Sequence, residues 1–361
     1  MAEKSDFNEI EFKKPFYKIK KPLRDHLQQY SRLDSFPISY EDLLRYRDLI
    51  PLTDKDGNKT LWNGVMFDPN DGDHIRKGLL EIYQKLSADG EHLSYLRIEN
   101  IDYCTYGNSK PFRVKVVNEI NDNHDYFYVK RADASRVYGL ELEHIFSPDK
   151  ISYLVDKETL VEEHIVGIPC DEYIKKHQGK KVENRLRLAK EFVKFNERCF
   201  IRLLGDMRAY NFVVEINQDF DNVQYRLRAM DFDQQSYEGR KNMYLPQFYK
   251  DNIALVELAK ELMTYDAAEQ YMKQERAAMR KRFQAARQRT RSLLRRMRTD
   301  IISSQENVDT LKEELFMYHG NPNFKLCKTM GEILILHLEC KLGIKVFEVK
   351  STDASSTRKS A

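Results

Sequence analysis

The sequence predicts an α+β protein with two lobes: a small antiparallel sheet lobe over residues 93–166 and a larger helical lobe over residues 167–349. Two observations support this. Before residue 167, short runs rich in β-branched and aromatic residues alternate with turns that contain Gly, Asn or Pro. After it, long segments carry apolar residues at helical spacing. We therefore expect one sheet with a single helix on it, followed by a mainly helical region.

Composition excludes several classes of protein. Of the 361 residues, 41% are hydrophobic and 32% are charged, which is typical of a globular protein. No run reaches the roughly 18 uncharged apolar residues of a membrane helix, and the first residues do not resemble a secretory signal. Five cysteines, none in a CxxC pair, argue against a disulfide framework and a structural zinc site. We expect a cytoplasmic protein with no membrane span.

Residues 1–92 are expected to form a mainly helical accessory region of unassigned role. Residues 42–49 and 75–86 carry apolar residues at helical spacing, and charged turns at 53–60 and 67–73 interrupt the region. Neither turn has the acid spacing and closing glutamate of a calcium loop.

The sheet lobe is expected to contain five strands and one helix. The strands cover residues 95–104, 112–120, 125–132, 151–156 and 159–166, and the helix covers 135–146, between the third and fourth strands. Each of the first two turns contains Gly, Asn or Pro, as hairpins require.

The helical lobe is expected to contain a strand hairpin among long helices. The hairpin joins residues 211–216 to 225–232. The helices cover residues 183–204, 246–263, 267–299 and 329–342. Residues 350–361 are small and polar, so a disordered tail is expected.

One segment is strongly basic. The formal net charge of the chain is only +3, but residues 273–298 hold eleven lysines and arginines against one acid, Glu275. Apolar residues recur along it at helical steps, namely Met279, Phe283, Ala286, Thr290, Leu293 and Met297. This pattern is typical of a core-facing helix with a solvated basic back. Two alternatives stay open: a docking surface for an anionic partner, namely an anionic substrate, nucleic acid or acidic membrane lipid, and dimerisation through the stripe.

Three segments hold side chains that together could act on a nucleotide. A triphosphate needs a cation on a rigid element, which Lys130 can supply at a strand end. It also needs a metal held by oxygen ligands, for which Asn211 and Asp231 are suitable. Asp206 can act as base for an acceptor hydroxyl. Pairing of the predicted hairpin would bring these acceptor groups to one end of one ribbon.

With these residues in place, the stretch from about Tyr95 to Ser236 resembles the protein-kinase-like fold, closest in style to aminoglycoside and small-molecule kinases. Lys130 matches the third-strand lysine, and Glu141 matches the helix glutamate that orients it, with Glu143 as second choice. No subfamily is assigned.

The resemblance also implies nucleotide and metal contacts. GDMRAYN resembles the catalytic loop, with Asp206 as catalytic aspartate and Asn211 as metal ligand. MDFD resembles the segment whose first aspartate, here Asp231, binds magnesium, and Asp233 could add a second carboxylate. The segment containing Glu163, His164 and Ile165 resembles the hinge that binds adenine. The backbone amides of Gly107, Asn108 and Ser109 could contact phosphate.

Three departures from the pattern bear on function. The turn TYGNSKPF has one glycine and no GxGxxG. Leu204 and Gly205 stand where protein kinases have His-Arg, and Asp233 replaces the glycine of DFG. Arg208 could neutralise an anionic substrate group, although a structural salt bridge is the ordinary interpretation.

The resemblance implies an ATP- and Mg²⁺-dependent phosphotransferase that acts on a hydroxyl of an unknown small molecule or protein. Alternatives are a catalytically silent kinase-like module that binds partners, and an enzyme that transfers AMP instead of phosphate. A further alternative is binding of an anionic partner through the basic helix. Each keeps the chain soluble and without a membrane span.

Overall fold

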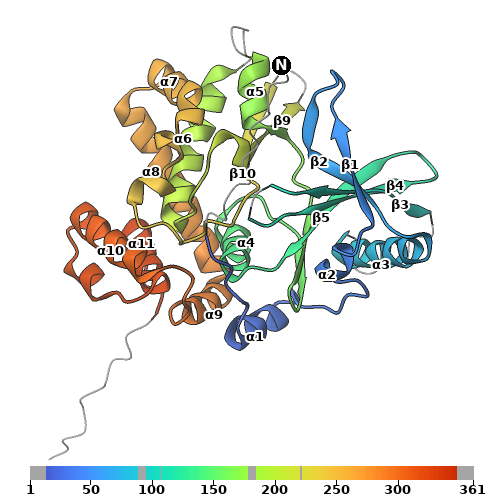
Figure 1. Ribbon diagram of the computed structural model, residues 1–361. Helices are drawn as coiled ribbons and strands as arrows, with labels where there is room; N and C mark the ends of the chain where they lie inside the picture. The colour runs from blue at the N-terminus through green and yellow to red at the C-terminus, as the bar shows by residue number, and fades with distance from the viewer. Residues whose placement is uncertain (1–13, 88–94, 107, 178–183, 220–221, 348–361) are drawn as a thin grey trace, which may run out of the picture.

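The computed structural model describes residues 14–87, 95–106, 108–177, 184–219 and 222–347 (Figure 1). A seven-stranded antiparallel sheet forms one lobe, and helices with a three-stranded sheet form the other. Within these ranges, no helix combines the length and apolarity needed to cross a bilayer. The expected α+β division into a sheet lobe and a helical lobe is therefore present.

The large sheet has the order β1-β2-β3-β4-β5-β7-β6. Its strands are β1 (Asp48–Thr53), β2 (Lys59–Met66), β3 (Leu96–Cys104), β4 (Phe112–Asn118), β5 (His124–Arg131), β6 (Tyr153–Asp156) and β7 (Thr159–Glu163). The five strands expected in the sheet lobe are all present. The hairpin of β1 and β2 extends the same sheet, so part of the expected accessory region belongs to the sheet lobe.

The helical expectation for residues 42–49 was wrong over most of its length. Only α2 (Tyr40–Leu43) is helical, and β1 begins at Asp48. The segment is too short for its apolar spacing to distinguish one helical turn from the start of a strand. The second expected helix is correct, because α3 (Pro69–Ser87) covers residues 75–86.

The sheet separates a core from a charged face. On β4, Phe112, Val114 and Val116 are buried against α3, where they join Ile75 and Leu79 in one cluster. Because side chains alternate along a strand, the residues between them face the other way. On β5, Val129 belongs to the same cluster, so the side chain of the next residue, Lys130, lies on the face of the sheet away from α3.

Helix α4 (Ala134–Phe146) lies between the two lobes, and every residue in it except His144 is buried (Figure 1). Asp133 caps its start by accepting hydrogen bonds from the backbone amides of Ser135 and Arg136. The N-terminal segment braces this cap, because the Lys14 ammonium lies 2.7 Å from the Asp133 carboxylate. The start of α4 is therefore held from two sides.

The helical lobe follows the expected order with two additional helices. Its elements are β8 (Ile168–Pro169), α5 (Cys170–His177), α6 (Arg185–Arg202), β9 (Phe212–Asp219), β10 (Asn222–Ala229), α7 (Ile253–Leu262), α8 (Tyr265–Ala285), α9 (Arg287–Met297), α10 (Gln305–His319) and α11 (Met330–Leu342). The hairpin of β9 and β10 and the helices at 183–204 and 329–342 match expectation. Helices α5 and α10 were not predicted. Residues 246–252 form short 3₁₀ turns before α7 begins.

The basic segment forms two helices, α8 and α9, which meet at Ala286. Met279, Phe283, Leu293 and Met297 are buried, as expected for a core-facing stripe. The interruption between α8 and α9 at Ala286 was not expected, because a single helix was predicted over residues 267–299.

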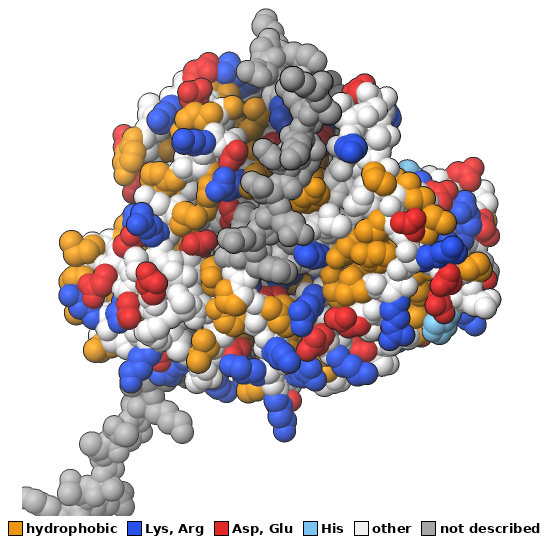
Figure 2. Space-filling view, in the orientation of Figure 1, with side chains coloured by type: hydrophobic (Ala, Val, Ile, Leu, Met, Phe, Trp, Pro, Cys, Tyr) orange, Lys and Arg blue, Asp and Glu red, His pale blue; other side chains and the backbone are white. Residues whose placement is uncertain are grey.

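Several arginines of this segment hold the lobe together. Arg276 lies 2.7 Å from Glu197, and Arg289 binds the buried Glu141. Arg280 and Arg291 donate to backbone carbonyls near the end of α11. Figure 2 shows further lysines and arginines along the lower edge, where α1 (Lys21–Gln29) and α9 lie in Figure 1. At least four of the eleven basic residues of this segment therefore have internal partners.

Candidate functional site

Three of the expected site residues, Lys130, Asp231 and Asp233, lie together where α4 meets the end of β10. Lys130 is the penultimate residue of β5, and its ammonium donates to the Glu162 carboxylate of β7 over 2.7 Å. The guanidinium of Arg136 also contacts Glu162, and its Nη1 lies 2.9 Å from Asp231 and 3.0 Å from Asp233. We call these five residues the charge cluster. It joins the sheet lobe to the segment that follows β10.

Four of the five side chains of the charge cluster are almost closed to solvent. The side chains of Lys130, Arg136, Glu162 and Asp233 are at most 9% exposed, whereas that of Asp231 is 32% exposed. When all five groups are ionised, three carboxylates face two cations. The site therefore has an excess of negative charge.

Burial and neighbouring charges change the pKa values of the cluster. Burial opposes ionisation of Glu162, but the charges of Arg136 and Lys130 outweigh it and lower its pKa to about 2. Burial and the nearby carboxylate of Asp233 raise the pKa of Asp231. Burial, together with the guanidinium of Arg136, lowers the pKa of Lys130.

The expected pair of Lys130 and Glu141 is wrong. The acid beside Lys130 is Glu162, which the sequence did not single out. Glu141 lies five residues after Arg136 on α4, about 140° around the helix axis. Its carboxylate binds three groups on the far side of α4, which belong to His26, Tyr153 and Arg289.

The second choice, Glu143, also has another partner, because it forms a buried ion pair with Arg202 of α6. Burial opposes ionisation of Glu141, but hydrogen bonds from His26 and Arg289 hold its pKa well below the usual range. Both glutamates of GLELEHI thus join α4 to its neighbours by buried ionic contacts.

Asp206 lies on the expected loop between α6 and β9, in a conformation that few aspartates adopt. Its φ is +54°, and such left-handed backbone costs on the order of 1 kcal/mol outside glycine. Its amide donates to the Tyr249 hydroxyl over 3.0 Å, and its carboxylate accepts from Arg208 over 2.9 Å. The Asn211 side-chain amide donates to the Asp206 carbonyl over 2.7 Å. The surrounding loop therefore fixes the Asp206 carboxylate.

The strand hairpin brings Asn211 to the ribbon end that precedes Asp231, as expected. In the register of β9 and β10, Phe212 lies opposite Ala229. One step beyond, the amide of Met230 donates to the Asn211 carbonyl over 3.0 Å. Asn211 and Asp231 thus belong to the same end of one ribbon.

The carboxylates expected to hold Mg²⁺ do not fit a metal as they are placed. Asp231 and Asp233 both accept from one nitrogen of Arg136. Across the described parts of the chain, no three His, Cys, Asp or Glu side chains are grouped so that they could hold one ion. Mg²⁺ requires oxygens at about 2.1 Å in near-octahedral geometry, so no chemical step is assigned to it.

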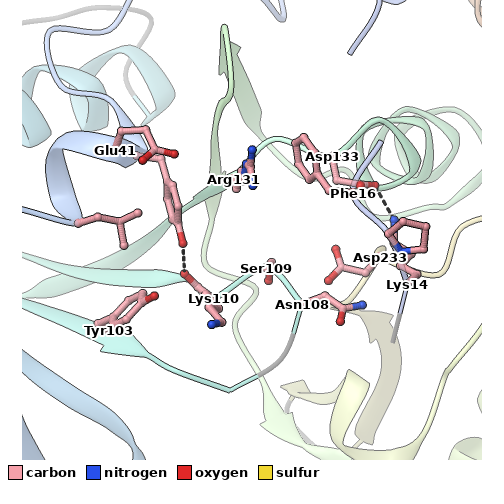
Figure 3. A pocket seen from close by; sticks show the side chains of 13 residues that line it. Lys14, Phe16, Glu41, Tyr103, Asn108, Ser109, Lys110, Arg131, Asp133 and Asp233 are labelled. Carbon is pink, nitrogen blue, oxygen red and sulfur yellow. Dashed lines mark hydrogen bonds and ion pairs between the residues drawn. The ribbon is translucent and has the colours of Figure 1, made fainter. Parts of the chain in front are cut away.

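A cavity of about 490 Å³, lined mainly by the sheet lobe and the N-terminal segment, reaches the helical lobe at Asp233, the member of the charge cluster that lines it (Figure 3). Asn108 and Ser109 of the expected phosphate turn line it, opposite Asp233. Gly107, the third residue of that expectation, lies outside the described residues. Lys14 and Arg131 also line the cavity, and this volume suits a small-molecule ligand. We call it the interlobe cavity.

The segment expected to bind adenine is partly engaged in the sheet. The amide of His164 donates to Tyr126, and that of Glu163 donates to Ser152. The Tyr128 hydroxyl lies 3.1 Å from the His164 imidazole. These two amides are therefore occupied by protein carbonyls. Ile165 is buried beside them.

Arg136 and Glu162 were missed for different reasons. Glu162 lies opposite Tyr128, two residues from Lys130, only because β7 pairs with β5 in one particular register. Arg136 follows an ordinary helix cap, where an arginine is commonly solvated. The one available signal was an acid, Glu162, directly after the apolar residues Leu160 and Val161 of the expected strand 159–166.

No protein-family model matches the chain, and no curated protein shows significant similarity to it. The kinase-like interpretation therefore rests on residue types, their order and the geometry described above.

Proposed function

We propose that the chain is a kinase-like phosphotransferase that binds ATP across the interlobe cavity and the adjoining charge cluster, and transfers its γ-phosphoryl group to a hydroxyl of an acceptor. One observation carries the proposal. A buried lysine–glutamate pair, Lys130 and Glu162, lies in the same charge cluster as Asp231 and Asp233, which come from beyond the lobe boundary. A lysine fixed by a glutamate is the arrangement that positions phosphates in kinases.

The roles follow from the contacts of each side chain. Lys130 offers a positive charge to the phosphates, and Glu162 fixes its position. Asp206 accepts the proton of the acceptor hydroxyl while the acceptor oxygen bonds to the γ-phosphorus and ADP leaves. Asn211 and Arg208 hold Asp206 in place through the hydrogen bonds described above. Positioning and electrostatics supply most of the catalysis in this class of reaction.

Nucleotide binding tests the first half of the proposal. We expect ATP to raise the melting temperature of the wild type, because a ligand that binds only the folded state stabilises it. Lys130→Met should abolish this rise. Lys115→Met is the matched control, because Lys115 lies on the neighbouring strand and pairs with Glu99 over 2.5 Å. Equal ATP responses in both variants would contradict the assignment of Lys130.

Measurement of phosphoryl transfer tests the second half of the proposal, the role of Asp206 in catalysis. We expect Asp206→Asn to bind ATP normally but to lower phosphotransfer by roughly 10²–10⁴-fold, the usual contribution of a general base. Asp251→Asn is its control, because Asp251 is the other acid beside Arg208, at 3.4 Å. Reactions with γ- and α-labelled ATP separate transfer of phosphate from transfer of AMP.

A catalytically silent binding module is the second candidate. It is favoured because the expected catalytic acids all contact arginines: Asp206 binds Arg208, and Asp231 and Asp233 share Arg136. ATP binding without turnover at any tested acceptor would support this candidate.

A further inference from the structure

The guanidinium of Arg136 lies at the centre of three carboxylates. Its Nε and Nη2 contact Glu162, and its Nη1 contacts Asp231 and Asp233. Nη2 also lies 3.4 Å from the carbonyl of Met230. A guanidinium has five N–H donors, so each of them has an acceptor here. The side chain is 1% exposed.

The three acids come from two separate parts of the chain, and Arg136 is the cation that all three contact. Glu162 lies on β7 of the sheet lobe, and the two aspartates follow β10. A divalent ion commonly joins carboxylates in this way, but a planar monovalent cation lies between them here. We propose that Arg136 is the resident cation of this site, and that Asp231 and Asp233 do not bind a divalent metal ion in the native protein.

Arg136 cannot be exchanged for a metal without a large rearrangement. Helix α4 is buried, and the contact of Lys14 with the capping Asp133 holds its first turn. Removal of the guanidinium from the cluster would leave Glu162 and Asp233 buried without their main counter-charge. Breaking a buried ion pair from one side is strongly destabilising. A metal must therefore compete with a fixed, fully hydrogen-bonded cation.

This inference deepens the proposed function, because the charge cluster borders the cavity on which that function rests. Arg136 joins the two lobes as a bound metal would, so the site is organised before any ligand arrives. It follows that ATP, if it binds, stabilises the protein equally with EDTA and with Mg²⁺.

The test uses Mn²⁺ alone on the full chain, with bound ion measured by electron paramagnetic resonance and stability by thermal melting. We expect the wild type to show no Mn²⁺ site that depends on Asp231 and no change in melting temperature. Arg136→Met should melt lower in EDTA, because three carboxylates then surround an empty position. Mn²⁺ at roughly tenfold above its dissociation constant should raise the melting temperature of this variant by about 2 °C or more. Arg136→Lys keeps a cation and should respond less.

A wild-type Mn²⁺ site that Asp231→Asn abolishes would overturn the inference, whether or not the Arg136 variants fold. A folded Arg136→Met protein whose melting temperature does not change with Mn²⁺ would also overturn the inference. ATP stabilisation that requires Mg²⁺ would refute metal exclusion and leave the proposed function standing. Absence of ATP stabilisation in both EDTA and Mg²⁺ would instead remove the proposed function, while the Mn²⁺ result would still stand.

Discussion

Glu141 and Glu162 provide the sharpest comparison, because each is a buried glutamate bound by an arginine but only Glu162 belongs to the charge cluster. The structure assigns Glu141 to stability alone. Its carboxylate is fully buried and contacts His26 of α1, Tyr153 of β6 and Arg289 of α9. In Glu141→Gln the geometry is nearly kept, but Arg289 loses its counter-charge.

The magnitude follows from the burial of the partners. Breaking a buried ion pair from one side costs about 3–5 kcal/mol. The side chain of Arg289 is 15% exposed, so water can partly solvate it. We therefore expect Glu141→Gln to lower the free energy of unfolding by about 3 kcal/mol, measured by urea denaturation. A loss below about 1 kcal/mol would refute this reasoning.

Comparison of Glu141→Gln with Glu162→Gln distinguishes an effect on stability from an effect on ATP binding. We expect folded Glu141→Gln to keep the ATP-dependent rise in melting temperature, and Glu162→Gln to lose it together with stability. Glu162→Gln removes the charge that both Lys130 and Arg136 contact. If Glu141→Gln lost ATP binding while Glu162→Gln kept it, the helix glutamate expected from the sequence would be the correct partner of Lys130.

Three further outcomes are expected. Lys14→Met should lower the free energy of unfolding by about 1–3 kcal/mol, because it leaves the buried carboxylate of Asp133 without its ion pair. Lys18→Met is the control: the Lys18 side chain is 77% exposed, so this variant should change the free energy of unfolding by less than about 0.5 kcal/mol. Equal effects of the two variants would contradict the bracing of α4. Gly331→Ala should lower the melting temperature, because its Cβ would lie 2.1 Å from a backbone carbonyl of α9, and overpacking of this kind costs about 1–3 kcal/mol; an unchanged melting curve would rule out this close approach. Partial burial lowers the pKa of His144 and of His319 from 6.5 to about 4, so the unfolded chain binds more protons below pH 6.5 and the urea midpoint should fall as the pH is lowered from 6.5 to 4. A constant midpoint across that range would contradict these lowered pKa values.

Much of the local structure could be predicted because local patterns reflect local geometry. The period-2 alternation in FRVKVV indicated β4, and the turns around it indicated a hairpin. The apolar stripe through Met279, Phe283 and Leu293 indicated which face of the basic segment is buried. The hairpin at 48–66 was missed because its strands are mostly exposed and carry little alternation.

For the candidate site, sequence order placed Lys130, Asp206, Asn211 and Asp231 on the elements where the structure has them. Residue type and position relative to strand ends were sufficient for that. The same reasoning chose Glu141 as the partner of Lys130, because a helix glutamate at that point fitted the family pattern. The sequence pattern does not show how α4 is rotated about its own axis in the folded protein.

The amino-acid sequence by itself determined the order of most strands and helices, the buried faces of most of these, and the short list of polar residues near one ribbon end. Only the tertiary structure decided which charges meet. The register of β5 with β7 puts Glu162 beside Lys130, and the rotation of α4 turns Arg136 toward the aspartates and Glu141 away from them. Periodicity records which side of an element is buried, but the partner across the interface depends on how separate elements pack.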